Sequence, residues 1–290
     1  MKIAIIGYGK MGHMIERMAL DRGHEISVII DVDNLADIDS KAFRKSDVAI
    51  EFTKPDTAVN NLLRCFSAGV PVVCGTTGWL DSLDAVKAVC ESGKGALLYS
   101  SNFSIGVNIF EAVSRYLAKI MNAYPQYTPS IEEVHHIHKL DHPSGTAITI
   151  AEELIAASDR VDRWEEAVEI SDSPEPSDSH EPTEPSSNCQ HCAEDVSPKT
   201  PKTPNDQESR TLYISHRREG EVPGIHTVTW DSPQDAITIS HSAKSREGFA
   251  LGAVLAAEWL AEKCRKFSVG PLKIGSGQTG FFTMKDMLRF

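Results

Sequence analysis

The stretch KIAIIGYGKMG, residues 2–12, decides the fold that we expect for this chain. A short apolar run leads directly into the pattern Gly-x-Gly-x-x-Gly and then into a helix-like segment, and a second apolar run ends at Asp31. This order predicts a dinucleotide site, because the glycines let the backbone approach a pyrophosphate and the carboxylate accepts hydrogen bonds from a ribose. The residues predicted to bind the nucleotide here are Gly7, Gly9, Lys10, Met11, Gly12 and Asp31.

Short apolar runs alternate with amphipathic stretches through the first 80 residues or so. This alternation predicts βαβ units and an α/β, Rossmann-like, doubly wound parallel sheet. Two further strands end in the turns EFTKP, residues 51–55, and GTTGW, residues 75–79. Ligands bind outside the carboxyl ends of such strands, so these turns are expected to line the nicotinamide side of a cofactor, unless they are turns alone. The residues predicted to do so are Phe52, Thr53, Gly75, Thr76 and Thr77.

The pattern changes from about residue 100. A helix is expected within residues 100–124, starting at Asn102, Ser104 or Asn108, and another helix is capped near Ser144. Alternating segments predict the strands of an open sheet, and a small, apolar helix follows near the end. The expected strands span 127–139, 211–220, 224–230 and 235–243, and the last helix spans 249–263.

These elements predict two domains. Residues 1–104 and 246–290 form the dinucleotide-binding domain, and residues 105–245 form a second α+β domain, built on an open mixed sheet, for substrate binding and oligomerisation. Within the second domain, residues 171–210 hold seven of the chain's fifteen prolines, with nine acidic residues against three basic ones. This composition predicts a disordered loop. Its single C-x-x-C, Cys189 and Cys192, has no second pair at zinc-site spacing, so no site is expected there.

Composition excludes several partners. The chain of 290 residues carries a formal net charge of -12 and 41% apolar residues, which fits a globular protein and argues against nucleic acid or an anionic membrane as partner. No apolar run approaches the length of a bilayer span, and the apolar start is too short for a signal peptide. Scattered cysteines suit reduced thiols, so a cytoplasmic location is expected.

The stretch EEVHHIHKLDHPSGTA, residues 132–147, predicts the reactive chemistry. A histidine can donate a proton near neutral pH, and a lysine beside the N–H groups of a helix start can bind carboxylates. His135 and His136 should occupy opposite faces of a strand, which leaves His138 and His142 as structural or exposed histidines.

Together with GYGKMG, VVCGTTGW, NFSIGVN, HSAKSREGFALGA and GFFTMKDML, this stretch resembles the dihydrodipicolinate (4-hydroxy-tetrahydrodipicolinate) reductase family over nearly the whole chain outside residues 171–210. The resemblance implies a homotetrameric enzyme of lysine and diaminopimelate biosynthesis that reduces a cyclic dicarboxylate to tetrahydrodipicolinate with NADH or NADPH. It implies His135 as general acid and Lys139 as catalytic cation. The substrate-binding residues that it implies are His136, Lys139, Ser144, Gly145 and Thr146. Further implied cofactor contacts are Ser101, Asn102, Phe103, Arg246 and Phe249.

NADH is the expected cofactor. Asp31 is followed by no arginine that could hold a 2′-phosphate, although Lys10 could soften the preference. Two rival hypotheses stay open at this point. One is another Rossmann dehydrogenase acting on a small amino or keto acid. The other is a non-catalytic nucleotide-binding regulator or a metal-binding module, in which His135, His138 and Asp141 hold the ion; the favoured hypothesis needs no metal.

Overall fold

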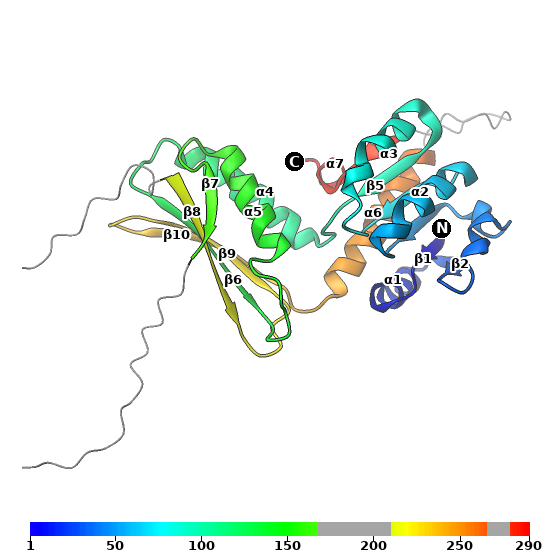
Figure 1. Ribbon diagram of the computed structural model, residues 1–290, viewed down its shortest axis with the longest axis horizontal. Coiled ribbons are helices and arrows are strands. Elements are labelled where there is room, and N and C mark those ends of the chain that lie inside the picture. Colours follow the sequence, from blue (N-terminus) through cyan, green and yellow to red (C-terminus); the bar gives the residue numbers. More distant parts are fainter. Residues whose placement is uncertain (168–209, 266–278) are drawn as a thin grey trace, which may run out of the picture.

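Two sheets organise the chain, as the ribbon shows (Figure 1). The computed structural model describes residues 1–167, 210–265 and 279–290. The predicted loop, including Cys189 and Cys192, therefore lies outside the described residues except at Arg210. Within the described residues, no helix has the length and apolarity needed to cross a bilayer.

The first sheet has six strands, all parallel, in the order β11-β5-β4-β3-β1-β2. Its strands are β1 (Lys2–Ile6), β2 (Glu25–Ile30), β3 (Val48–Glu51), β4 (Val72–Cys74), β5 (Ala96–Tyr99) and β11 (Gly280–Phe282). Its helices are α1 (Lys10–Asp21), α2 (Pro55–Ala68), α3 (Leu83–Val89), α6 (Glu247–Arg265) and α7 (Met284–Leu288), with short 3-10 or π segments at Leu35–Asp39, Phe43–Lys45, Leu80–Ser82 and Cys90–Lys94.

Helices cover both faces of this sheet. One core joins α1 and α6 to alternate strand residues such as Ile3 and Ile5, and the other joins α2 and α3 to Ala4 and Ile6. The strands are mainly apolar because helices cover both faces of the sheet. The predicted doubly wound sheet is confirmed.

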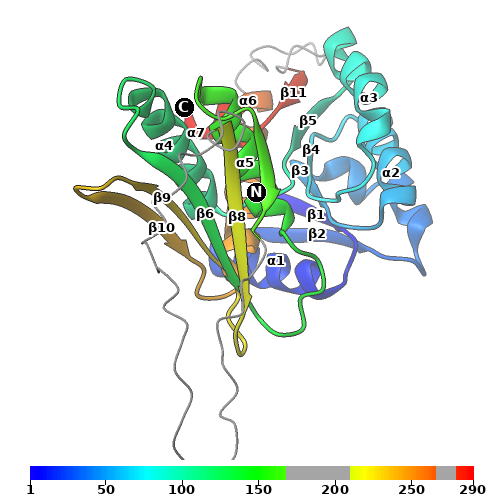
Figure 2. The ribbon, with the colours of Figure 1, turned by 60° about the vertical axis from the view of Figure 1, so that its left-hand side comes forward.

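The second sheet has five strands in the order β10-β9-β6-β8-β7. Its central strand pairs with β8 in parallel and with β9 antiparallel, so the sheet is mixed, as predicted. Its strands are β6 (Thr128–His135), β7 (Arg163–Glu166), β8 (Thr211–Arg218), β9 (Ile225–Asp231) and β10 (Ala236–Ser242). The helices α4 (Ile105–Met121) and α5 (Gly145–Ala157) lie on one face of it (Figure 2).

The helix starts follow from side-chain caps. Of the three expected starts of α4, Ser104 is the N-cap, and its hydroxyl accepts a hydrogen bond from the N–H of Val107. Ser144 caps α5 in the same way, accepting from the N–H of Ala147, as predicted. The domain boundaries at residues 104/105 and 245/246 stay a prediction.

The strand expected over residues 127–139 is too long. The strand β6 ends at His135, and the chain then turns, with the N–H of Ile137 donating to the carbonyl of Gly220 and the N–H of Lys139 donating to the carbonyl of His136. The histidines after His135 therefore do not alternate between the faces of a strand.

Candidate active site

The glycine turn is shaped to receive a bound group. Gly7 has a positive φ of 92°, and a Cβ there would lie 2.0 Å from the carbonyl oxygen of Phe52. Gly9 caps α1 and has no heavy atom within 4 Å of the place that its Cβ would occupy. The backbone N–H groups at the start of α1 are thus open to a ligand, and they fit the pyrophosphate of a dinucleotide.

A buried carboxylate, Glu51, holds together two of the predicted cofactor turns. It ends β3 with no exposed surface and accepts hydrogen bonds from the hydroxyls of Thr53 and Thr76, the latter at 2.7 Å. The N–H of Thr53 in turn donates to the Thr76 hydroxyl at 2.7 Å. Because both hydroxyls are engaged inside the protein, these two threonines offer a cofactor their backbone rather than their side-chain oxygens.

A cavity of about 850 Å³ is lined both by residues predicted to bind the cofactor and by residues predicted to bind the substrate. Predicted cofactor residues that line it are Met11, Thr77, Ser101, Asn102, Arg246 and Phe249, and predicted substrate residues that line it are His135, His136, Lys139, Ser144, Gly145 and Thr146. The side-chain amide of Asn102 reaches the Thr146 hydroxyl at 3.5 Å, so the two groups meet directly.

Other predicted cofactor residues lie away from this cavity, namely Gly7, Gly9, Lys10, Gly12, Asp31, Phe52, Thr53, Gly75, Thr76 and Phe103. Most of them belong to the glycine turn and the strand ends of the parallel sheet, where an extended dinucleotide would lie. Phe103 differs, because its side chain is only 2% exposed and packs against the ring of Phe52. A cofactor could contact Phe103 through its backbone alone.

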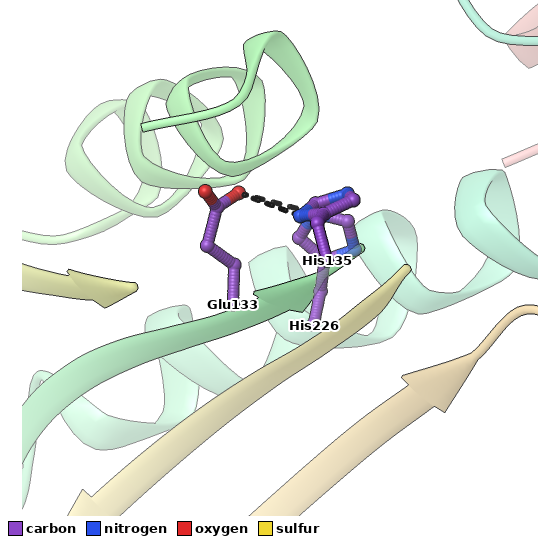
Figure 3. Close-up of side chains that lie close together, drawn as sticks. All are labelled: Glu133, His135 and His226. Carbon is purple, nitrogen blue, oxygen red and sulfur yellow. Dashed lines mark ion pairs between the residues drawn. The ribbon is translucent and has the colours of Figure 1, made fainter. Parts of the chain in front are cut away.

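His135 belongs to a buried cluster that the sheet register assembles (Figure 3). Glu133 and His135 share one face of β6, and the Cα partner of Glu133 on β9 is His226. The Glu133 carboxylate lies 3.5 Å from Nδ1 of His135 and 3.7 Å from Nε2 of His226. The two imidazole rings meet edge to face, with their centroids 5.1 Å apart.

Burial and hydrogen bonding together set the charges in this cluster. Burial by itself would raise the pKa of Glu133, but hydrogen bonds from His226 and Ser144, with the nearby His135, lower it to about 2. Burial lowers the pKa of His135 to about 4, against the opposing attraction of Glu133. At neutral pH the cluster therefore holds one carboxylate and a neutral His135, although the sequence predicts an acid with a pKa near neutrality.

The start of α5 is fixed by the same carboxylate. The N–H of Ser144 donates to both Glu133 oxygens, at 3.1 and 3.2 Å, and the Ser144 hydroxyl lies 3.2 Å from Nε2 of His226. A side chain at Gly145 would meet nothing within 4 Å. The open N-terminus of α5 beside Gly145 and Thr146 can accept an anion.

Lys139 faces the cavity in an ion pair with Asp141, whose oxygens lie 2.7 and 2.8 Å from its Nζ. Arg218 braces this turn, donating to the carbonyls of Lys139 and Asp141 at 3.1 and 2.8 Å. The lysine side chain is only 20% exposed, whereas Asp141 is 63% exposed. A substrate carboxylate that replaced the exposed partner Asp141 would find the cation already in place.

The positions of the other histidines show that one prediction, the opposite orientation of His135 and His136, is wrong. His136 does not lie on the opposite side from His135, because the turn after β6 brings both to the same cavity. His138 also lines the cavity, yet it is well exposed and pairs with Glu221 at 3.1 Å. His142 is half exposed and pairs with Glu166 at 2.6 Å. The exposed character predicted for His138 and His142 agrees with the structure.

The rival metal set is not assembled. Its member His138 is engaged with Glu221 and its member Asp141 with Lys139. Among the described residues, the His, Cys and acidic side chains whose ligand atoms converge within 4.8 Å form two other clusters, Glu133–His135–His226 and His142–Glu166–His216.

Sequence reasoning missed several residues around the cavity. Glu133 could have been found, because it stands two positions before His135 and therefore on the same face of a strand. Glu111 lines the cavity from α4, and burial, with the neighbouring Glu153, raises its pKa to about 7. No local signal marked Glu111, His226 or Arg218, because pairing between distant segments brings them to the site.

Comparisons with known proteins agree along the chain. Residues 1–103 match the family described as dihydrodipicolinate reductase, N-terminus, and residues 106–288 match dihydrodipicolinate reductase, C-terminus. A 4-hydroxy-tetrahydrodipicolinate reductase of Christiangramia forsetii is 38% identical over 288 residues, covering 99% of this chain and 98% of its own length. The enzyme of the same name from Archaeoglobus fulgidus is 30% identical over 304 residues, covering 99% and 100%.

A solved structure has a similar fold. The dipicolinate-bound dihydrodipicolinate reductase from Paenisporosarcina sp. TG-14 aligns with a TM-score of 0.62 at 20% identity, over 90% of this chain and 94% of its own.

Proposed function

The chain belongs to the dihydrodipicolinate reductase family, and from that premise we propose how its cavity reduces 4-hydroxy-tetrahydrodipicolinate to tetrahydrodipicolinate. The enzyme is an NAD(P)H-dependent oxidoreductase of lysine biosynthesis. The bound reduced nicotinamide supplies the hydride. The residues of the chain bind the dicarboxylate, orient it and deliver the proton that balances the reduction.

We assign the proton to His135. Loss of the 4-hydroxyl as water converts the substrate to a conjugated imine, and hydride addition to that imine leaves an enamine-like anion that must take up one proton. Although His135 is neutral at pH 7 in the chain alone, a substrate with two carboxylates favours the imidazolium, because anions raise the pKa of a neighbouring base. Glu133, ionised at any working pH and 3.5 Å away, stabilises that imidazolium.

Two anion sites hold the substrate. Lys139 binds one carboxylate after exchanging Asp141, with which it pairs in the chain alone. The N-terminus of α5 binds the other through the N–H groups of Gly145 and Thr146, while Ser144, whose N–H donates to Glu133, caps the helix beside them. His136 lines the same cavity and completes the substrate-binding group.

One observation carries this assignment: a single cavity is lined both by His135 with the anion sites and by the nicotinamide-side residues Thr77, Ser101 and Asn102. The test is an assay with freshly generated product of the preceding synthase, following the loss of reduced cofactor. The wild-type chain should consume cofactor only when this substrate is present. Equal or faster consumption with other small keto or amino acids would contradict the assignment.

We further propose that NADH is preferred. Asp31 follows β2 directly, at the position where a carboxylate would hydrogen-bond the ribose diol and repel a 2′-phosphate. Lys10 begins α1 and is exposed, which could moderate the preference. Comparing kcat/KM for the two cofactors tests this, and equal or better use of NADPH would contradict it.

A homotetramer in the cytoplasm is also proposed. The helices α4 and α5 cover one face of the five-stranded sheet, while the other face carries cross-strand pairs of exposed Thr and Ser, and no described helix packs on it. We expect this uncovered face to pair with the same face of another subunit in a self-complementary interface. Sedimentation analysis should give four times the chain mass of 31.8 kDa.

A further inference from the structure

We propose that His142, Glu166 and His216 form a binding site for one divalent transition-metal ion of the zinc class, outside the reductase cavity. Their ligand atoms lie within 4.8 Å of one another, and none of the three residues lines the cavity. The site also shares no residue with the rival metal set His135, His138 and Asp141.

Three separate segments bring the ligands together. Glu166 ends the edge strand β7, His216 lies on the neighbouring strand β8, and His142 lies in the turn before α5. Nδ1 of His142 is 2.6 Å and Nδ1 of His216 is 2.9 Å from the same oxygen, Oε1 of Glu166. The two rings stack at 16° with centroids 4.4 Å apart, so both Nδ1 atoms lie beside the same carboxylate oxygen, and the rings must rotate before both can face one ion.

Hydrogen bonding accounts for only part of this cluster, the 2.6 Å bond between Nδ1 of His142 and Oε1 of Glu166. Although Nδ1 of His216 is close to Glu166, the angle is unsuitable, and among the described residues this buried nitrogen has no hydrogen-bond partner. A buried polar nitrogen without a partner costs free energy, and a metal ion between the three groups would use its lone pair directly.

The geometry allows such an ion after the two stacked rings rotate and the ligand atoms move apart. Tetrahedral zinc, with bonds of about 2.0–2.1 Å to nitrogen and oxygen, separates its ligand atoms by about 3.4 Å. The present separations of 2.6 and 2.9 Å would need to open by less than about 1 Å. Two imidazoles and a carboxylate are ligands that zinc, cobalt and nickel accept, with a fourth position left for water.

The cluster of His142, Glu166 and His216 adjoins two parts of the substrate site, the strand β6 and the start of α5. His216 is the Cα partner of Glu133 across β6 and β8, and His142 stands two residues before Ser144, the cap of α5. A bound ion would therefore tie the turn before the substrate-binding helix start to the edge of the sheet. This role adds to the reductase reaction and does not depend on it.

The test uses the full chain without an affinity tag, stripped of metal by a chelator and dialysed. Zinc binding is measured by competition with a chromogenic chelator, and Co²⁺ is added separately to record its absorption spectrum. The wild-type chain should bind one ion in the micromolar range, and the Co²⁺ spectrum should show tetrahedral bands without sulfur charge transfer. His216→Gln and Glu166→Gln should each weaken binding more than about 100-fold, because even outer partners of a ligand are worth about 10- to 100-fold.

The matched control is His138→Gln, which removes a histidine from a two-membered surface pair with Glu221 and should leave zinc binding unchanged. Zinc should also raise the melting temperature of the wild-type chain but not that of His142→Gln, whose half-exposed side chain can be replaced without loss of folding. Absence of stoichiometric binding by the wild-type chain would overturn the proposal. Binding that survives in His216→Gln but is lost in Cys189→Ser/Cys192→Ser, or in His226→Asn, would overturn it as well, because the ion would then occupy another cluster.

Discussion

Replacing Glu133 with Gln tests how the buried carboxylate acts on His135. The carboxylate lies 3.5 Å from Nδ1 of His135, and at an effective dielectric constant of about 20 that distance corresponds to about 5 kcal/mol of attraction for an imidazolium. The cavity admits solvent, which reduces the effect to about 2–3 kcal/mol. Because 1.36 kcal/mol corresponds to one pKa unit, Glu133→Gln should lower the pKa of His135 in the substrate complex by about 1.5–2 units.

The expected result is a fall in kcat of roughly 30- to 100-fold at pH 7.5, with a smaller change in KM. The limb of the pH profile on which kcat declines with rising pH should move to lower pH by about 1.5–2 units, because the proton donor must be charged. A merely structural effect would lower the active fraction without moving that limb.

The matched control is Glu132→Gln, since Glu132 pairs with Arg217 and lies on the other face of β6. Its kcat should stay within about twofold, in line with the small effect of exposed ion pairs. A folded Glu133→Gln variant with wild-type kcat and an unmoved pH profile would refute the reasoning.

Further outcomes follow from the same site. His135→Gln should lower kcat by about 10²–10⁴ and leave NADH affinity within tenfold, which steady-state kinetics and cofactor titration would measure. Lys139→Ala should raise KM and lower kcat together, whereas His138→Gln should change both much less. The pKa of His135 is lowered to about 4, so below about pH 6.5 the unfolded chain binds a proton at this residue that the folded chain does not. The free energy of unfolding should therefore fall by up to about 3 kcal/mol as the pH drops towards 4. Urea unfolding from pH 7.5 to 4.5 should show a shallower decline for His135→Gln than for the wild-type chain. Deleting residues 174–207 with a short flexible linker should leave activity within a few-fold, and a large loss of thermal stability or of the proposed tetramer would contradict this.

Predictions that depend on residues close together in the sequence were correct. The glycine turn after β1, the alternating apolar runs and the cap at Ser144 each depend on residues within a few positions of one another. Strand propensity, positive φ and helix capping act over that range, so the doubly wound sheet and the helix start beside the anion site could be predicted.

Only the tertiary structure decided how the reactive groups are charged and held. The sequence marked His135 but not its environment, because hydrogen bonds from His226 and Ser144, with the nearby His135, lower the pKa of Glu133 against the opposing effect of its burial. His226 reaches the site through the pairing of β6 with β9, and Arg218 reaches it through β8. The end of β6 at His135 likewise depends on these neighbours, which is why the faces expected for His136 were wrong. Strand register and desolvation are set by contacts between distant segments, and no local pattern encodes them.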